Sequence, residues 1–450
     1  MTKIEILHDT TFTPDGTGII RYTVDGKPVE TQPLPCFFSG YKYFNPIQTV
    51  FAMYYSGGSC LISAPTSAGK TLTGAQFCKK VLTSGCNVIY TAPTQALARE
   101  IYTKLKELFS RVYLKLTGYD EEDVRLPSSE AIIVTTYEAV QLGLRNKVSW
   151  ARNLGGIIID EFHQILSSRG DIIEEIVAVG LLQGTPMLCL SATLPEPYKV
   201  AKWIGVDLFI YSNWRPVPLE RIIVDEDLHQ IVTHYAMDNA KTIVFVGTKS
   251  KGWNVLKMLH RHGYRIINET VPFEKDDHPE STLPFIAFHC ADVPLEEQVT
   301  IEKKFKTASD FNLLVATHTL AYGVNLPADR VVIAVTKGRD FWPNLIDVLQ
   351  MEGRAGRLGL KEKGQSIIVP VSADSTRRSK MLNRLNRDLD GCLSTGFIPS
   401  LKKKLLEGKN GIEDILHVFL VPFAYFNDKS KHKALIDKFY SLSDVVKNLY

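Results

Sequence analysis

The stretch that decides the fold is Ala64-Pro65-Thr66-Ser67-Ala68-Gly69-Lys70-Thr71, which follows the apolar run Cys60-Leu61-Ile62-Ser63 and precedes a segment of helical composition. A strand, a tight loop ending in Gly-Lys-Thr and a helix together form a phosphate cradle, because backbone N–H groups and the positive helix end face the phosphates. Lys70 would bridge the outer phosphates and Thr71 would offer its hydroxyl to Mg²⁺. The loop therefore predicts a nucleoside triphosphate site, although Ala64 stands where the pattern usually has glycine.

The composition is that of a globular protein. The hydrophobic residues make up 45% of the chain and the charged residues 22%. The length of 450 residues is enough for two domains and a smaller part. The net charge of +3 is too small to indicate a nucleic-acid partner by itself. No apolar run approaches the ~20 residues that span a bilayer, and the charged start has no secretory pattern.

The seven cysteines form no Cys-x-x-Cys pair, which argues against a zinc or iron–sulfur site. An odd, scattered set of cysteines is typical of a reducing compartment. We therefore expect an intracellular protein, in the cytoplasm or the nucleus.

Short β-rich apolar runs alternate with amphipathic segments in two stretches, which predicts two tandem α/β domains with parallel sheets. The strands expected in the first stretch are 59–63, 88–91, 131–135, 156–160 and 187–191, with a helix over 94–109. Those expected in the second are 242–246, 285–288, 313–317, 331–336 and 365–371, with helices over 250–262 and 295–306.

The remaining parts of the chain differ from these two stretches. Asp25-Gly26 predicts a β-hairpin near the start, in which Pro28 restricts one strand to a sheet edge. Two prolines in the segment from Trp214 to Leu219 predict an extended crossover between the domains. The expected division is a β extension over 1–35, an ATP-binding domain over 36–212, a second α/β domain over 213–373, and a small helical region over 374–450.

A second motif of the first stretch is a buried strand, Gly156-Ile157-Ile158-Ile159, that ends in Asp160-Glu161-Phe162-His163. Adjacent acids at the end of a strand point in different directions, which allows a division of labour. Asp160 would hold Mg²⁺ through water, and Glu161 would polarise the attacking water. The alternative, acids that merely cap the next helix, is weakened by the phosphate loop that precedes them.

The second stretch contains Gln350-Met351-Glu352-Gly353-Arg354-Ala355-Gly356-Arg357. Arg354 and Arg357 can reach one anionic target together, and an arginine on a transferring phosphoryl group contributes about 10³–10⁵ in rate. Because these arginines belong to the second domain, we expect the nucleotide to bind between the domains. A basic helix that faces solvent would explain the arginines but not the glycines.

In their order and in their residues, these motifs resemble those of superfamily-two DExH-box helicases of the Ski-like branch. Asn45-Pro46-Ile47-Gln48 is similar to the adenine-reading Q motif, which makes Gln48 the expected reader. The resemblance assigns catalytic roles to Lys70, Asp160, Glu161, His163, Gln350, Arg354 and Arg357, and nucleotide contacts to Gly323 and Asn325. It implies two RecA-like domains, with ATP and Mg²⁺ as cofactors.

Within the branch, the chain resembles archaeal fork-repair helicases and the helicase domain of polymerase theta. The sequence matches theirs at Trp150, Arg169-Gly170, Ala201-Lys202-Trp203 and Trp214 to Leu219. There are two departures: Phe288-His289-Cys290-Ala291-Asp292 stands where His-His-Ala-Gly-Leu is usual, and Gln298 stands where an arginine is usual. Such helicases usually continue through a winged helix, a helical ratchet and a last small domain, and residues 374–450 leave room for part of a winged helix.

A nucleic-acid strand lying across both domains would be held through its phosphates, which carry no sequence information. The residues expected to contact it are Thr94, Arg99, Thr117, Gly118, Thr135, Thr248, Thr317 and Thr319. Arg99 has an alternative as a partner of Glu100. In the segment Lys337 to Asn344, Phe341 or Trp342 would stack on the terminal base pair as a wedge, or else both pack under a helix.

The expected function is an ATP-dependent DNA helicase or translocase that moves 3′ to 5′ on single-stranded and forked DNA; polarity and DNA preference come from the resemblance. One alternative is an RNA helicase of the same branch, because a grip on phosphates hardly needs the 2′-OH. Another is an ATP-switched clamp that holds nucleic acid without unwinding it. A small-molecule P-loop kinase fits poorly, because it would not need two such domains.

Overall fold

The described residues form two compact units, one over Met1–Trp214 and one over the described residues from Arg215 onward. The computed structural model describes residues 1–66, 68–116, 126–146, 148–151, 153–192, 194, 196–274, 281–318, 320, 326–335, 345–356, 363–371, 376 and 378–383. The expected helical region over 374–450 lies outside these residues, apart from a few positions at its start.

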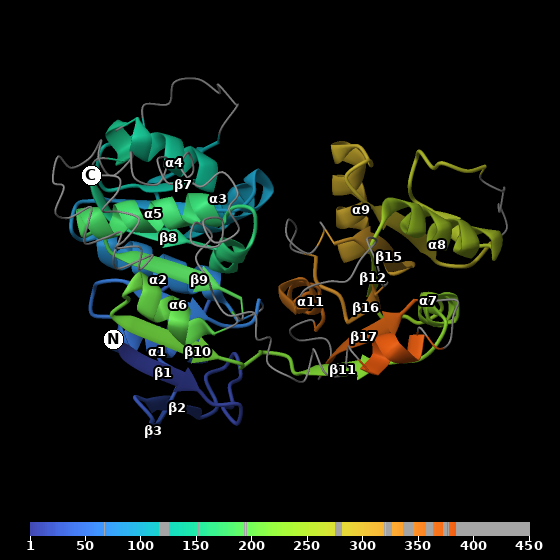
Figure 1. Cartoon of the computed structure of the whole chain (residues 1–450), viewed down its shortest axis with the longest axis horizontal. Coiled ribbons are helices and arrows are strands. Elements are labelled where there is room, and N and C mark those ends of the chain that lie inside the picture. Colours follow the sequence, from blue (N-terminus) through green and yellow to red (C-terminus); the bar gives the residue numbers. More distant parts are fainter. Residues whose placement is uncertain are drawn as a thin grey trace, which may run out of the picture. The chain divides into compact units, whose positions relative to one another are not determined.

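The first unit is built on a ten-stranded sheet with the order β3-β2-β1-β10-β4-β9-β8-β5-β7-β6 (Figure 1). Its strands are β1 Thr2–Ile6, β2 Ile20–Val24, β3 Lys27–Thr31, β4 Cys60–Ser63, β5 Asn87–Ala92, β6 Val112–Lys115, β7 Ile132–Thr136, β8 Leu154–Ile159, β9 Met187–Ser191 and β10 Leu208–Ser212. The strands from β1 to β6 in this order are parallel, whereas β2 and β3 pair antiparallel.

Helices cover both faces of this sheet, because the strand residues alternate between two hydrophobic cores. Ile62 faces the core shared with α1 Pro46–Tyr54, α2 Lys70–Leu82 and α3 Gln95–Leu108. Leu61 faces the core shared with α4 Tyr137–Arg145, α5 Gly170–Gln183 and α6 Pro197–Ile204. Two short 3₁₀ helices, η1 Ser149–Ala151 and η2 Phe162–Leu166, complete the unit.

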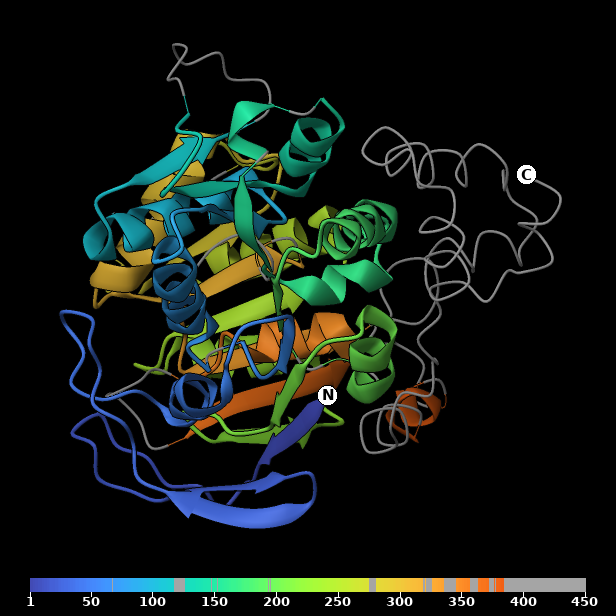
Figure 2. The ribbon, with the colours of Figure 1, turned by 90° about the vertical axis from the view of Figure 1, so that its left-hand side faces the viewer.

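The predicted N-terminal hairpin is confirmed, and it extends the sheet of the first unit. Asp25 and Gly26 both have positive φ, 49° and 83°, as a tight type I′ turn requires. Pro28 lies on β3, the edge strand, as expected. Because β1 pairs in parallel with β10, the N-terminal strands belong to the sheet whose strand β4 precedes the nucleotide loop. The hairpin lies beside β1 in Figure 2.

The second unit has a seven-stranded parallel sheet with the order β11-β17-β16-β12-β15-β14-β13. Its strands are β11 Leu219–Ile223, β12 Thr242–Val246, β13 Arg265–Ile266, β14 Phe285–His289, β15 Phe311–Thr317, β16 Arg330–Val335 and β17 Gly364–Pro370. Its helices include α7 Leu228–Ala236, α8 Lys249–Arg261, α9 Leu295–Thr307 and α11 Leu345–Glu352. The edge strand β11 begins at Leu219, the last residue of the expected crossover.

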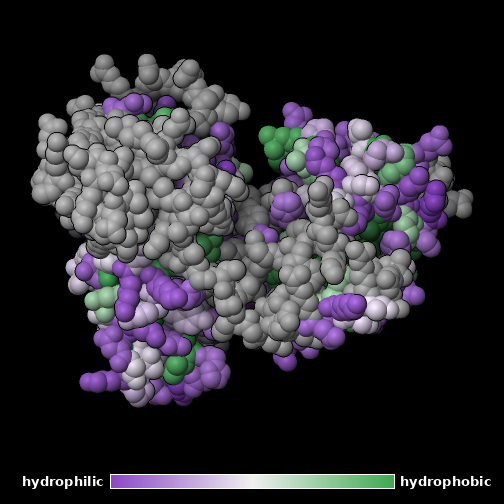
Figure 3. All heavy atoms as spheres, in the orientation of Figure 1, coloured by the Kyte–Doolittle hydropathy of each residue, from purple (hydrophilic) through white to green (hydrophobic). Residues whose placement is uncertain are grey.

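One face of the molecule can be judged for its polarity in Figure 3. Figure 3 shows hydrophilic residues over most of the coloured surface, with hydrophobic residues in small groups. Within the described ranges, none of the helices is long and apolar enough to pass through a bilayer.

Candidate active site and nucleic-acid contacts

The phosphate loop lies between β4 and α2, as the sequence predicts. Lys70 is 5% exposed, and its ammonium donates hydrogen bonds of 2.9 Å to the carbonyl oxygens of both Ala64 and Pro65. Gly69 has a φ of +77° and provides no side-chain cap for the first turn of α2. The start of α2 is therefore a helix N-terminus with a lysine ammonium beside it, and both features suit an anion.

A glycine is also required at position 69 because the side chains of Asn45 and Gln48 lie close to its Cα atom. A Cβ atom there would lie 2.5 Å from Asn45 Nδ2 and 2.7 Å from Gln48 Nε2. Asn45 and Gln48 form a capping box at the start of α1, and their amide groups donate to the carbonyls of Ala68 and Gly69, both at 3.0 Å. Helix α1 thus braces the phosphate loop.

Gln48 lies beside the phosphate loop, where an adenine reader would be expected. Its amide oxygen accepts the Asn45 N–H at 3.0 Å, and its amide nitrogen donates to Gly69. The described contacts thus give Gln48 a bracing role, and its contact with adenine stays a prediction.

Asp160 directly follows β8 and is 7% exposed. Its Oδ1 accepts the backbone N–H of Glu161 at 2.9 Å. Burial, followed by the nearby Glu161 carboxylate, raises the pKa of Asp160 to about 7, and the ammonium of Lys70 opposes this rise. Lys70 and Asp160 therefore lie near each other, after β4 and β8, which are separated in the sheet by β9 alone.

Two buried tyrosines hold this segment, and sequence reasoning gave them no such role. The Tyr90 hydroxyl, from β5, donates to Asp160 Oδ2 at 3.3 Å. The Tyr137 hydroxyl, from α4, donates to the backbone oxygen of Asp160 and, at 3.4 Å, to that of Glu161. Burial raises the pKa of both tyrosines, so both hydroxyls remain protonated donors.

Glu161 adopts a left-handed backbone conformation, with φ 51° and ψ 43°, which is uncommon for a residue with a side chain. Its Oε2 lies 3.3 Å from Nδ1 of His163, which is 1% exposed. Glu161 Oε2 thus lies beside His163, whereas Asp160 Oδ2 lies beside Tyr90, and their division of labour stays a prediction.

The chemistry of the donor set suits Mg²⁺. Thr71 offers a hydroxyl and Asp160 a carboxylate, which are oxygen ligands of the kind that Mg²⁺ combines with water and phosphate oxygens. A cation beside the buried Asp160 would also favour its ionised form. Within the described part of the chain, no cluster of three or more His, Cys, Asp or Glu residues forms a dedicated metal cage.

The segment Ser191-Ala192, at the end of β9, is tied to the phosphate loop. Ala64 N–H donates to the Ser191 oxygen at 3.0 Å. The Ser63 hydroxyl accepts the Leu194 N–H at 3.2 Å and donates to the Ala192 oxygen at 3.4 Å. A shift of the phosphate loop would therefore be transmitted directly to this segment.

In the second unit, the arginine motif begins on α11, where Gln350 is 2% exposed and Arg354 is half-buried. Ala328 fixes the end of the motif through two backbone hydrogen bonds of 2.8 Å, one to the Arg354 oxygen and one from the Gly356 N–H. Gly356 has a φ of +95°, and a Cβ atom there would lie 2.9 Å from Val217. The positive φ and the nearby Val217 together explain why residue 356 is a glycine.

Glu352 anchors the same motif and was not expected to have a role. It is 1% exposed, and its carboxylate accepts two hydrogen bonds, of 2.6 and 2.7 Å, from Arg221 on β11. Ser366 on β17 donates to the same carboxylate at 3.0 Å, and Arg215 donates to the Glu352 backbone oxygen at 2.9 Å. Burial lowers the pKa of Arg215.

The threonines expected to contact nucleic acid fall into two groups. Thr94 and Thr248 occupy the same position in the two units: each follows a strand and caps the next helix, accepting an N–H at 3.2 or 3.3 Å. Thr135 and Thr317 lie within strands and are 0% and 6% exposed. Thr135 is thus a correction: its hydroxyl is inside the sheet, while its neighbour Thr136 caps α4.

Arg99 is exposed on α3. Glu100, its suggested partner, pairs with Lys104 at 2.5 Å. Gln298, which replaces an arginine of the resembling helicases, donates to the carbonyls of Cys290 and Val293 at 3.2 and 2.7 Å and so fixes the loop before α9.

Several predicted residues lie outside the described residues, and their roles stay predictions. They are Ser67, Thr117, Gly118, Thr319, Gly323, Asn325, Phe341, Trp342 and Arg357.

Comparison with known proteins gives a family match in each of the two units. Residues 45–200 match the DEAD/DEAH box helicase family, and residues 224–359 match the helicase conserved C-terminal domain. The chain belongs to the superfamily-two helicases.

Its relatives point to one branch. The ATP-dependent DNA helicase Hel308 of Thermoplasma volcanium is 30% identical over 363 residues, 74% of this chain and 53% of that protein. Hel308 of Caldivirga maquilingensis is 31% identical over 409 residues, 77% of this chain and 53% of that protein. DNA polymerase theta of Caenorhabditis elegans is 28% identical over 70% of this chain and 23% of that protein. The chain spans about half the length of the Hel308 proteins that it matches.

Proposed function

We propose that this protein is an ATP-dependent helicase or translocase that moves 3′ to 5′ on single-stranded and forked DNA. The observation that supports the ATPase part is that the Lys70 ammonium, the buried Asp160 carboxylate and the strained Glu161 lie near one another after strands β4 and β8 of the same sheet. Similarity to Hel308 proteins, named as DNA helicases, supports the DNA part.

In this proposal, the first turn of α2 and Lys70 bind the phosphates. Thr71 and Asp160 hold Mg²⁺, which would neutralise phosphate charge when bound. Glu161 accepts a proton from the attacking water, and His163 orients the Glu161 carboxylate. Arg354 and Arg357 would contact the phosphates from the second unit, and Gln48 the adenine.

The grip on DNA would involve helix N-termini after the strands, at Thr94 and Thr248, where backbone N–H groups suit phosphate oxygens. Such contacts carry no sequence information, which fits a translocase. We also propose an intracellular location, because the cysteines in the described ranges are all free thiols.

The test compares ATP turnover by the whole chain with single-stranded DNA, single-stranded RNA and a forked DNA duplex, followed by strand displacement on forks of either polarity. The proposal requires stimulation by DNA and opening of a fork with a 3′ tail. Stimulation by single strands without duplex opening would instead identify a clamp. Stronger stimulation by RNA would identify an RNA helicase, and the absence of stimulation by any nucleic acid would refute all three.

A further inference from the structure

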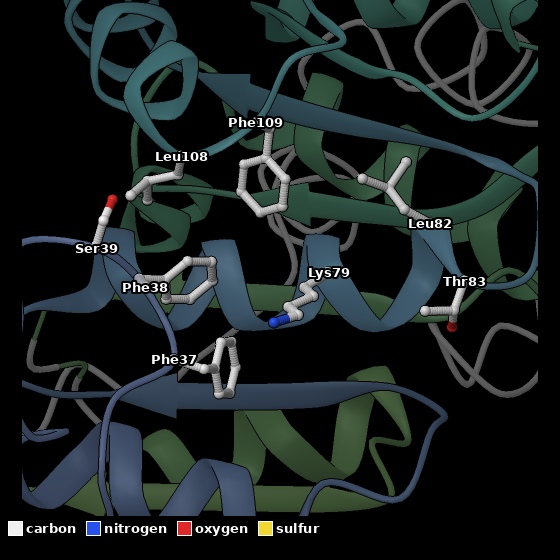
Figure 4. Close-up of a pocket in the computed structure, with 8 residues that line it drawn as sticks. All are labelled: Phe37, Phe38, Ser39, Lys79, Leu82, Thr83, Leu108 and Phe109. Atoms are coloured by element: carbon white, nitrogen blue, oxygen red, sulfur yellow. The ribbon is translucent and has the colours of Figure 1, made fainter.

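The first unit has a cavity that lies away from the phosphate loop. It has a volume of about 570 Å³, and six residues form most of its wall: Phe37, Phe38, Lys79, Leu82, Leu108 and Phe109 (Figure 4). Lys79 and Leu82 belong to the last turns of α2, whereas Lys70 begins that helix. At about 1.5 Å per residue, Lys79 is ~13 Å along the helix from Lys70. The cavity is therefore separate from the proposed ATP site.

The wall of the cavity is aromatic and firmly held. Phe38 is 7% exposed and packs edge-to-face on Phe109, with 5.8 Å between ring centroids. Phe37 packs edge-to-face on Phe44 at 5.0 Å, yet it remains 52% exposed. A fixed apolar floor and an exposed aromatic rim suit an apolar side chain that arrives from outside.

One cation lies at this cavity. The Lys79 ammonium is 3.9 Å from the centre of the Phe37 ring and 5.8 Å from that of Phe38. In the described part of the chain, no carboxylate forms an ion pair with it. The neighbouring Lys80 points elsewhere, because its ammonium donates to the Tyr55 oxygen at 2.6 Å. The cavity thus combines an apolar wall with a single unpaired positive charge.

We propose that this cavity binds an acidic segment of a partner protein, in which one aromatic side chain fills the cavity and an adjacent Asp or Glu pairs with Lys79. Ser39 and Thr83 also line the cavity, and their hydroxyls suit the backbone of an extended peptide. A nucleic-acid strand fits less well, because it needs a row of cations along its phosphates as well as aromatic rings.

The probe is a fluorescein-labelled decapeptide of Ser and Asp residues that carries one central Phe flanked by Asp. Its binding to the whole chain is followed by fluorescence anisotropy. Two control peptides replace the Phe by Ala or the flanking Asp residues by Asn. We expect saturable binding of the probe that weakens about tenfold or more without the Phe, and about two- to fivefold without the Asp residues at low salt.

Matched variants locate the binding. Phe37→Ala removes only a half-exposed ring, and Thr83→Trp fills the cavity from an exposed position, so both variants should keep the fold, as checked by circular dichroism. Both should weaken probe binding at least about fivefold. Lys79→Gln should weaken the Asp-containing probe but not its Asn control, whereas Lys80→Gln, with the same change in net charge, should leave both unchanged.

Three results would overturn the proposal: no saturable binding, binding that is indifferent to Phe37→Ala and Thr83→Trp, or an equal effect of the two lysine substitutions. A fourth is competition by an oligodeoxythymidine whose own binding is lost in Phe37→Ala, because this would assign the cavity to single-stranded DNA. None of these readouts requires ATP turnover, so the proposal fails or stands independently of the helicase activity.

Discussion

The Tyr90 hydroxyl on β5 donates a hydrogen bond of 3.3 Å to Oδ2 of Asp160, which follows the neighbouring strand β8. Tyr90 is fully buried, and its ring lies against Gly74 of α2. One tyrosine thus connects the helix that begins at the phosphate loop with the carboxylate proposed to hold Mg²⁺. This arrangement makes Asp160 a positioned group, and its position can be tested through the cation.

Tyr90→Phe keeps the ring and removes the hydrogen bond to Asp160. Loss of one such bond corresponds to about 1 kcal/mol, or about fivefold. We therefore expect the Mg²⁺ concentration for half-maximal ATP turnover to rise about fivefold, with little change at saturating Mg²⁺. The measurement is a Mg²⁺ titration of DNA-stimulated turnover. Tyr102→Phe on α3 is the control, and an equal shift in that variant would contradict the role of Tyr90.

Gly74→Ala should act through the same tyrosine. A Cβ atom at Gly74 would lie 2.8 Å from Cε2 of Tyr90, so the ring must move away from its present position. We expect a rise in the Mg²⁺ requirement similar to that of Tyr90→Phe, and little further change when the two are combined, because neighbouring substitutions on one contact are not additive.

Gly180→Ala on α5 is the matched control for this substitution. There the new Cβ would meet the flexible Met187 side chain, with Sδ at 2.6 Å, in the core on the opposite face of the sheet. Its Mg²⁺ titration should match that of the unmodified protein. Full additivity of Gly74→Ala and Tyr90→Phe would show that they act separately.

Glu161→Gln removes the proposed proton acceptor while keeping the shape of the side chain. General bases contribute about 10²–10⁴ in rate, so ATP turnover should fall at least about 100-fold. Binding of ATP, measured with a fluorescent analogue, should stay within about threefold, because the phosphates contact α2 and Lys70. Turnover near that of the unmodified protein would remove Glu161 from this role.

Glu352→Gln should loosen the arginine motif. The substitution removes the carboxylate that accepts two hydrogen bonds from Arg221, and hydrogen bonds to charged groups contribute about 1.5–3 kcal/mol each. We expect the free energy of unfolding of the second unit to fall by about this amount, measured by urea denaturation. Glu100→Gln breaks the exposed pair with Lys104 and should cost less than about 1 kcal/mol. Equal losses in the two variants would show that burial of Glu352 adds nothing.

Most strands buried on both faces were predicted, because a continuous apolar run marks them, although the buried strand β10 was missed. Residues 187–191 and 242–246 are strands with the predicted bounds, and the other predicted strands differ by one or two residues at their ends. β11 was not predicted, because its residues are largely exposed at a sheet edge and lack that pattern. The partnership of β1 with β10 depends on pairing between distant segments, which local sequence does not encode.

The candidate site shows the same limits. Lys70, Asp160 and Glu161 lie where their motifs predict, because each follows a recognisable strand. Tyr90 was missed because a tyrosine in an apolar strand is indistinguishable from core packing until its hydroxyl partner is known. Thr135 was predicted to contact a nucleic-acid strand, but β7 is buried along its whole length and the Thr135 side chain is buried with it.

The parallel pairing of β1 with β10 has a practical consequence for shortened versions of this protein. The family match begins at residue 45, whereas β1 covers one side of β10 and carries the β2–β3 hairpin. A version that began at residue 45 and kept β10 would leave unpaired backbone N–H and C=O groups along one side of this apolar strand, Leu208–Ser212, open to edge-to-edge association with another copy. Insolubility of such a version would reflect this uncovered strand and not a defect in the nucleotide site.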